Sequence, residues 1–137
     1  MSQNTAPIFT QTPDIQFARM ITTANPDHTM ATGVSSSIFL AGPSGSYVNK
    51  IRFKPSGSIN ATVVRVFINN GQTTTTATNN SLYGELSLPT ITTSNTTAQN
   101  DFEIPMNIAL PANYRLFATT ATALGGGLDI TTIAGDY

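Results

Sequence analysis

Short segments with alternating apolar side chains follow one another along the chain, and clusters of turn-forming residues separate them. Roughly eight or nine such segments are present, and none keeps a helical period for more than about two turns. The predicted strands cover residues 14–23, 29–41, 46–55, 62–70, 81–88, 101–109, 114–122 and 128–134. Regularly spaced short strands are typical of a β-sandwich or a small barrel. We therefore predict an all-β fold, a single antiparallel β-sandwich that is jelly-roll or Greek-key like, with an extended N-terminal arm.

The densest β-branched stretch, residues 62–71, is the predicted centre of this fold. Strand side chains alternate, so one face of the stretch is wholly apolar and the other face is mixed. The apolar face carries Val64, Val66 and Ile68, and the mixed face carries Val63, Arg65 and Phe67. This pattern predicts a central strand packed on both sides, or nearly so. Arg65 must then reach solvent, a carboxylate such as Glu85 or Glu103, or a neighbouring subunit.

The polar surface of the chain is built mainly from uncharged residues. Of the 137 residues, 39% are hydrophobic, which suits one domain with a real core. Only 9% are charged, whereas about 25% is usual, and the sequence contains 23 Thr and 12 Asn. Covering such a surface costs less side-chain entropy than covering long charged side chains. The composition favours a protein packed against neighbours, or else reflects a compositional bias of the source genome.

The first 13 residues are polar, contain two prolines and carry two apolar residues, Ile8 and Phe9. We predict an N-terminal arm over residues 1–13 and a β-sandwich domain over residues 14–137. An arm with apolar anchors can become ordered by adding to the sheet edge of a partner. The alternative is a terminal strand that docks on its own domain. In the strand that follows, Ile15, Phe17 and Arg19 point one way.

Basic residues do not form a cluster, and the formal net charge is −1. Residues Lys50, Arg52 and Lys54 alternate along one strand and are predicted to face outward with Val48, opposite a mostly core-facing set of Tyr47, Asn49, Ile51 and Phe53. Three charges are too few to neutralise a long phosphate backbone. We therefore expect no nucleic-acid partner, and interpret the row as a solvated or interface-facing strand.

Targeting and redox signals are also missing from the sequence. It contains no cysteine, which excludes disulfides and agrees with assembly in a reducing cytoplasm. The N-terminus lacks the basic and apolar regions of a signal peptide, and no apolar run approaches about 18 residues. We expect no membrane partner.

No constellation of residues predicts catalysis. The single histidine, His28, lies in a turn beside Asp27, and the seven carboxylates are scattered along the chain. Gly125, Gly126 and Gly127 precede a strand, so they lack the helix amides that a phosphate needs. We predict no enzyme activity, no cofactor and no metal.

Four short motifs carry a resemblance to a known group of proteins: RVFINNG at 65–71, NNSLY at 79–83, LPANYRL at 110–116 and AGDY at 134–137. Over roughly residues 45–137 the chain resembles small capsid decoration, or cement, proteins of tailed bacteriophages. The resemblance implies a β-sandwich on the outer capsid surface of the virion, often as a homotrimer. Its partner would be the major capsid protein, and its role would be to stabilise contacts between capsomers.

The candidate partner-binding residues are Ile8, Phe9, Arg19 and Arg65. A second hypothesis is a host- or glycan-binding module on a virion spike or tail, because loops on a rigid sandwich often carry recognition. It would use the Thr-rich loops at residues 72–80 and 89–100. A small hydrolase is the third class, and a pocket with converging titratable groups would be its mark.

Overall fold

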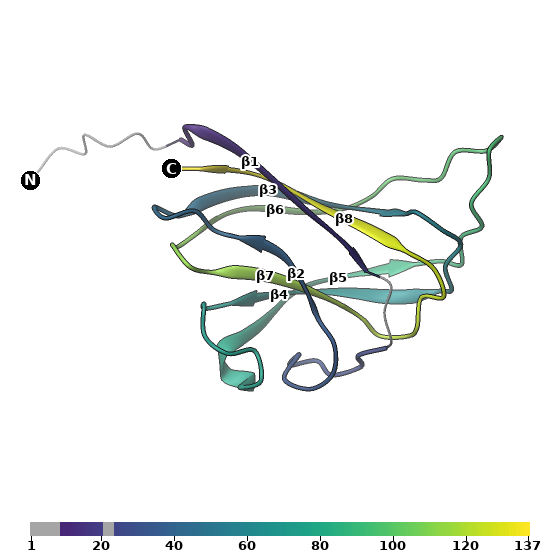
Figure 1. Cartoon of the computed structure of the whole chain (residues 1–137), viewed down its shortest axis with the longest axis horizontal. Helices are drawn as coiled ribbons and strands as arrows, with labels where there is room; N and C mark the ends of the chain where they lie inside the picture. Colours follow the sequence, from purple (N-terminus) through teal and green to yellow (C-terminus); the bar gives the residue numbers. More distant parts are fainter. Residues whose placement is uncertain (1–8, 21–23) are drawn as a thin grey trace, which may run out of the picture.

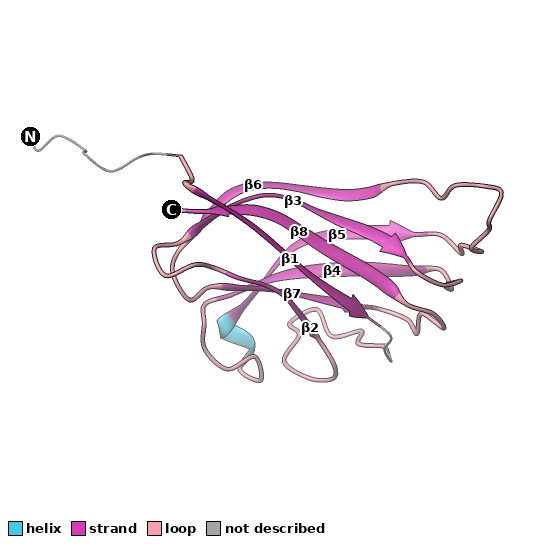
Figure 2. Cartoon of the chain, turned by 45° about the horizontal axis from the view of Figure 1, so that its top comes forward, coloured by secondary structure: helices cyan, strands magenta, loops and turns pink. Residues whose placement is uncertain are grey.

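The computed structural model describes residues 9–20 and 24–137, and within these ranges the chain forms two layers of four strands (Figures 1 and 2). Sheet A has the order β1-β8-β3-β6, and sheet B has the order β2-β7-β4-β5, with antiparallel pairing throughout. The strands are β1 (Thr12–Met20), β2 (Ser36–Leu40), β3 (Ser46–Pro55), β4 (Thr62–Asn69), β5 (Asn80–Leu88), β6 (Phe102–Leu110), β7 (Arg115–Thr120) and β8 (Leu128–Asp136). A 3₁₀ turn, η1 (Ala77–Asn79), precedes β5.

This strand order confirms the predicted antiparallel β-sandwich and specifies it as a jelly roll. Consecutive strands β1 and β2, β3 and β4, β5 and β6, and β7 and β8 lie in opposite sheets. Strands β3 and β4 are therefore not a hairpin, although they are consecutive in the chain, and face one another across the sandwich.

Strand β4 is central, as predicted, because it pairs with β5 on one side and β7 on the other. Its inner face contributes Val64 and Val66 to the main core. Its outer face is covered in part as well, since Phe67 forms a second buried cluster with Met30 and Phe117. Both faces of the strand are thus packed, which explains the near-continuous apolar sequence.

A β-bulge in β3 overturns part of the predicted facing. The register shifts between Val48 and Lys50 against both β6 and β8. One extra residue reverses the alternation that follows it. Val48 is consequently buried with Ile51 and Phe53, and Tyr47 lies outside with 37% of its surface exposed. The outward facing of Lys50, Arg52 and Lys54 is correct, and each makes a surface ion pair.

Strand β1 begins earlier than expected. Thr12 and Pro13, assigned above to the arm, pair with Asp136 and Gly135 of β8. Ile8 and residues 21–23, the expected end of this strand, lie outside the described residues. β1 is an edge strand of sheet A. Its Gln16 side chain bonds both the backbone N–H and the carbonyl of Leu40 in β2, so the two sheets are joined at this edge.

The predicted strand over 29–41 is only five residues long, because the chain before it forms a bonded loop. The Asp27 carboxylate accepts bonds from the backbone and hydroxyl groups of Thr29 and Thr32. The hydrogen bond from the backbone N–H of Thr29 is the main reason that the pKa of Asp27 lies far below its usual range. This loop leads the chain from sheet A to sheet B.

Candidate partner-binding face

The side of sheet A that points away from the core gathers exposed apolar and charged side chains, and we call it the outer face. Strand register sets these side chains in rows, since directly opposite residues share a face. The rows across β1, β8 and β3 are Ile15, Ile133 and Lys50; Phe17, Thr131 and Arg52; and Arg19, Asp129 and Lys54. Strand β6 adds Glu103 opposite Arg52, and Asp101 lies just before it.

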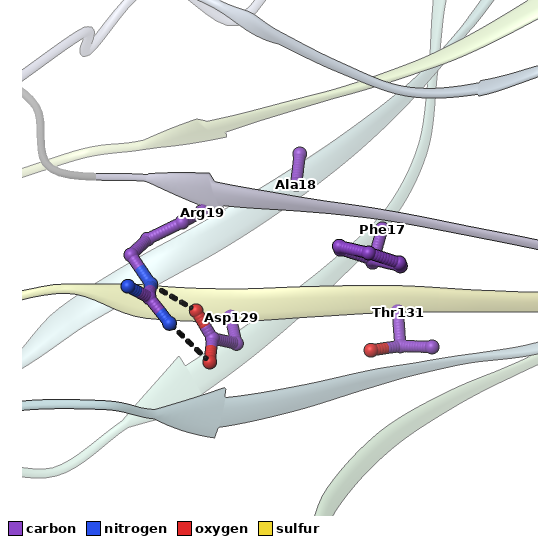
Figure 3. Close-up of a pocket in the computed structure, with 5 residues that line it drawn as sticks. All are labelled: Phe17, Ala18, Arg19, Asp129 and Thr131. Carbon is purple, nitrogen blue, oxygen red and sulfur yellow. Dashed lines mark hydrogen bonds and ion pairs between the residues drawn. The ribbon is translucent and has the colours of Figure 1, made fainter.

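The β1 side of the outer face is apolar. Phe17 is 78% exposed and Ile15 is 60% exposed, although both belong to a regular strand. Figure 3 shows the Phe17 ring on the β8 side of its strand near Thr131, while Ala18 points the opposite way. A hollow of about 460 Å³ lies here, lined by Phe17, Ala18, Arg19, Asp129 and Thr131. Large apolar side chains exposed on an edge strand form a surface on which another chain can pack.

The β3 and β6 side of the outer face is a ladder of ion pairs. Arg52 contacts Asp101 at 3.0 Å and Glu103 at 3.1 Å, Lys54 contacts Asp101 at 2.8 Å, and Lys50 contacts Glu103 at 3.4 Å. The hydrogen bond and charge of Lys54, followed by the charge of Arg52, lower the pKa of Asp101. The ladder is solvent-exposed, so its pairs contribute little to folding and remain open to a partner.

Arg19 and Asp129 form a separate ion pair at the end of β1. The Arg19 Nε donates to Asp129 Oδ1 at 2.6 Å, and a second nitrogen donates to Oδ2 at 3.2 Å (Figure 3). This two-bond geometry fixes the guanidinium beside Phe17. Arg19, a predicted partner-binding residue, therefore lies on the outer face.

Phe9 also reaches this side of the molecule. It is 72% exposed and lines a hollow of about 280 Å³ with Thr10, Tyr47 and Tyr137. Thr10 packs directly over Gly135 of β8, where a Cβ atom would come within 2.5 Å of its hydroxyl. The chain before β1 is thus seated on sheet A as far back as Phe9.

Arg65 lies elsewhere, on the outer side of sheet B. It is 8% exposed, and its Nε donates to Glu85 Oε1 at 2.8 Å. Glu85 is one of the carboxylates named above for it. The structure brings Phe9 and Arg19 to one side of the molecule, places Arg65 apart from them, and does not describe Ile8.

Ile15, Phe17 and Ile133 were not among the predicted site residues. The alternation of β1 already placed Ile15 and Phe17 on one face with Arg19. The pattern did not show whether that face meets the core or solvent, because both faces of the strand are partly apolar. Burial now assigns it, since Met20 on the opposite face is 1% exposed.

No three His, Cys, Asp or Glu side chains within the described residues lie close enough together to hold a metal ion. No helix in the same ranges is long and apolar enough to span a membrane.

No protein-family model and no curated protein matches the chain. Among solved structures, it is similar to chains in structures of infectious bursal disease virus, from the Gt strain at 11% identity and the Gx strain at 13%. The matches cover 98% and 97% of this chain but 36% of the viral chain in each case, with TM-scores of 0.36 and 0.33. This chain spans about a third of the length of the chains it matches. A likeness at this level does not identify a function.

Proposed function

We propose that the chain is a structural protein of a virion that acts by binding other proteins and has neither an enzyme activity nor a cofactor. Within that class, it is a capsid decoration protein that binds the outer surface of an assembled phage head. The class comes from the resemblance of the motifs at residues 65–71 and 110–116. The observation that carries the proposal is the exposure of Phe17 and Ile15 on a regular strand. Side chains so exposed add little to the stability of the fold, so their apolar surface is available to a partner.

The size of this apolar surface indicates what kind of partner it suits. Fully burying a Phe or Ile side chain stabilises by about 1.5–3 kcal/mol. With Phe17 78% exposed and Ile15 60% exposed, docking can recover roughly 2–4 kcal/mol from the two. Association itself costs about 4–15 kcal/mol. One copy of this face alone therefore binds weakly.

A repeating lattice removes this weakness. It offers many identical sites, and copies that contact one another on it bind with an increased effective concentration. A protein that binds only the assembled lattice then stabilises that state by mass action. In this proposal the partner is the major capsid protein, the decoration unit is a homotrimer, and assembly takes place in the host cytoplasm.

Sedimentation with purified heads tests the proposal. The protein is mixed at micromolar concentration with mature heads built from the major capsid protein of the same virus, and the heads are pelleted. Wild type and Leu82→Ala, which truncates a 37% exposed side chain on β5 of sheet B, should pellet with the heads. Phe17→Ala should stay largely in the supernatant. Wild-type protein that does not pellet excludes the decoration function.

A glycan-binding module is the second candidate, and one observation favours it. The loop between β5 and β6, which extends beyond the sandwich in Figure 2, borders a hollow of about 370 Å³. Its lining combines uncharged polar residues, Thr90, Thr92, Thr97, Gln99 and Asn100, with apolar ones that include Ile91 and Phe102. Hydroxyl and amide groups of this kind are suited to hydrogen-bonding a sugar. Binding on a glycan array that Thr92→Ala and Asn100→Ala abolish would support this function over the first.

A further inference from the structure

Charge is distributed unevenly over this protein. It has six basic and seven acidic residues, all of which lie in the described ranges. Seven of these thirteen are on the outer face: Arg19, Lys50, Arg52, Lys54, Asp101, Glu103 and Asp129. Four cations and three carboxylates give this face +1, and two cations and four carboxylates give the rest of the chain −2, which together make the net charge of −1. The outer face is therefore positive on a negative protein.

The excess cation belongs to the ladder of β3 and β6. Arg19 and Asp129 neutralise one another as a separate pair. The ladder itself holds three cations on two carboxylates, with Arg52 sharing both Asp101 and Glu103 with its lysine neighbours. Each basic side chain in it remains between 36% and 47% exposed. One further carboxylate would balance the ladder.

The apolar and charged parts of the outer face meet at a hollow of about 340 Å³. Ile15, Ile133 and Thr131 line one side of it, and Arg52, Lys54 and Asp101 line the other. An apolar side chain seated here has aliphatic contacts from β1 and β8. A negative group next to that side chain on the same segment comes within reach of Arg52 and Lys54. A positive group in that place meets the excess positive charge of the ladder.

We propose that this seam binds an acidic, apolar segment of the capsid lattice protein, in which a carboxylate side chain lies beside an apolar one. The proposal rests on the decoration function and specifies the chemistry of its partner. The apolar residue packs against Ile15 and Ile133, and the carboxylate completes the ladder at Arg52 and Lys54. Asp101 competes for the same two cations, since it is bonded to both.

Two substitutions of opposite expected effect test this chemistry in the head-binding assay. Lys54→Gln removes a cation from the seam and should weaken binding about three-fold at about 50 mM salt. Asp101→Asn removes the competing carboxylate and should tighten binding by a similar factor. A change that merely damages the fold weakens binding in both variants, so the opposite signs separate recognition from structure. Both effects should shrink at about 1 M salt, where charges are screened within about 3 Å.

Arg115→Gln is the matched control, because it removes one exposed cation from β7 of sheet B and gives the same net charge as Lys54→Gln. It should bind as the wild type does. Equal binding by Lys54→Gln and Arg115→Gln, or weaker binding by Asp101→Asn, overturns the proposal while the decoration function stands. Wild-type protein that fails to pellet with heads overturns both.

Discussion

Replacing Phe17 by alanine should leave the stability of the free protein nearly unchanged, whereas the same replacement at Phe53 should destabilise it strongly. The two residues are the same type of side chain on strands of the same sheet. They differ in that Phe17 is 78% exposed on the outer face and Phe53 is 1% exposed in the core. The comparison therefore isolates burial from residue type.

The magnitudes follow from these exposures. A buried Phe side chain contributes about 1.5–3 kcal/mol by transfer, so the covered fifth of Phe17 contributes roughly 0.3–0.6 kcal/mol. Lower strand propensity of alanine brings the expected loss for Phe17→Ala to about 1 kcal/mol at most. Phe53→Ala also opens a cavity and should cost about 3–5 kcal/mol.

Urea unfolding followed by circular dichroism measures both values on the purified protein. A loss greater than about 2 kcal/mol for Phe17→Ala would show that the ring supports the fold, because surface changes are normally within about 0.5 kcal/mol. The assignment of this side chain to partner binding would then be wrong. A small loss for Phe53→Ala would contradict the placement of the core.

Three further predictions concern charged groups. Burial and then the neighbouring Asp136 carboxylate raise the pKa of Asp14, so the folded state holds this proton more tightly and stability falls as pH rises through that window. Asp14→Asn should therefore melt at a higher temperature than wild type at about pH 7, and this difference should disappear near about pH 3. A melting temperature of Asp14→Asn below that of wild type at about pH 7 would contradict the prediction. Bonds from its own loop lower the pKa of Asp27, so their stabilisation is present above the unfolded pKa and is lost as pH falls below it. Asp27→Asn should therefore melt lower than wild type at about pH 7, and a gap that does not narrow between about pH 5 and about pH 2 would refute this reasoning. Glu85→Ala leaves the buried Arg65 guanidinium without its partner and should cost about 2 kcal/mol, whereas Arg65→Met should stay within about 1 kcal/mol in urea unfolding; the reverse order would contradict the described burial of Arg65.

The strands themselves were predictable because alternation is a local property of the sequence. The central place of β4 could also be predicted, since only a strand covered on both faces carries Val64, Val66 and Phe67 together. The order of strands could not. β1 pairs with β8 through contacts such as Arg19 with Asp129, which are 110 residues apart, and no local pattern encodes this pairing.

Bulges account for the errors within strands. The shift between Val48 and Lys50 moved Tyr47 to the outside; β3 has no glycine or proline at this point, although Pro105 of β6 lies opposite Lys50. In β2 the register also shifts, between Ser37 and Phe39, directly after a run of small residues.

The candidate face was only partly predictable for a related reason. The sequence singled out Phe9 as an apolar residue in a polar segment and Arg19 as an isolated charge, and both lie on the same side of the molecule. It predicted that Phe53 faces the core but assigned no face to Phe17, because the opposite face of the same strand, with Ala18 and Met20, is also partly apolar. Exposure of an apolar residue becomes visible only when the sheet order is known.

Cryo-electron microscopy of heads mixed with the protein tests the central claim most directly, because it shows which surface of the sandwich meets the lattice. The account predicts that sheet A faces the capsid, with Phe17 and Ile15 buried in the contact and Lys54 beside a carboxylate of the capsid protein. Density in which the outer face of sheet A is open to solvent, with sheet B or the β5–β6 loop against the lattice, would contradict it.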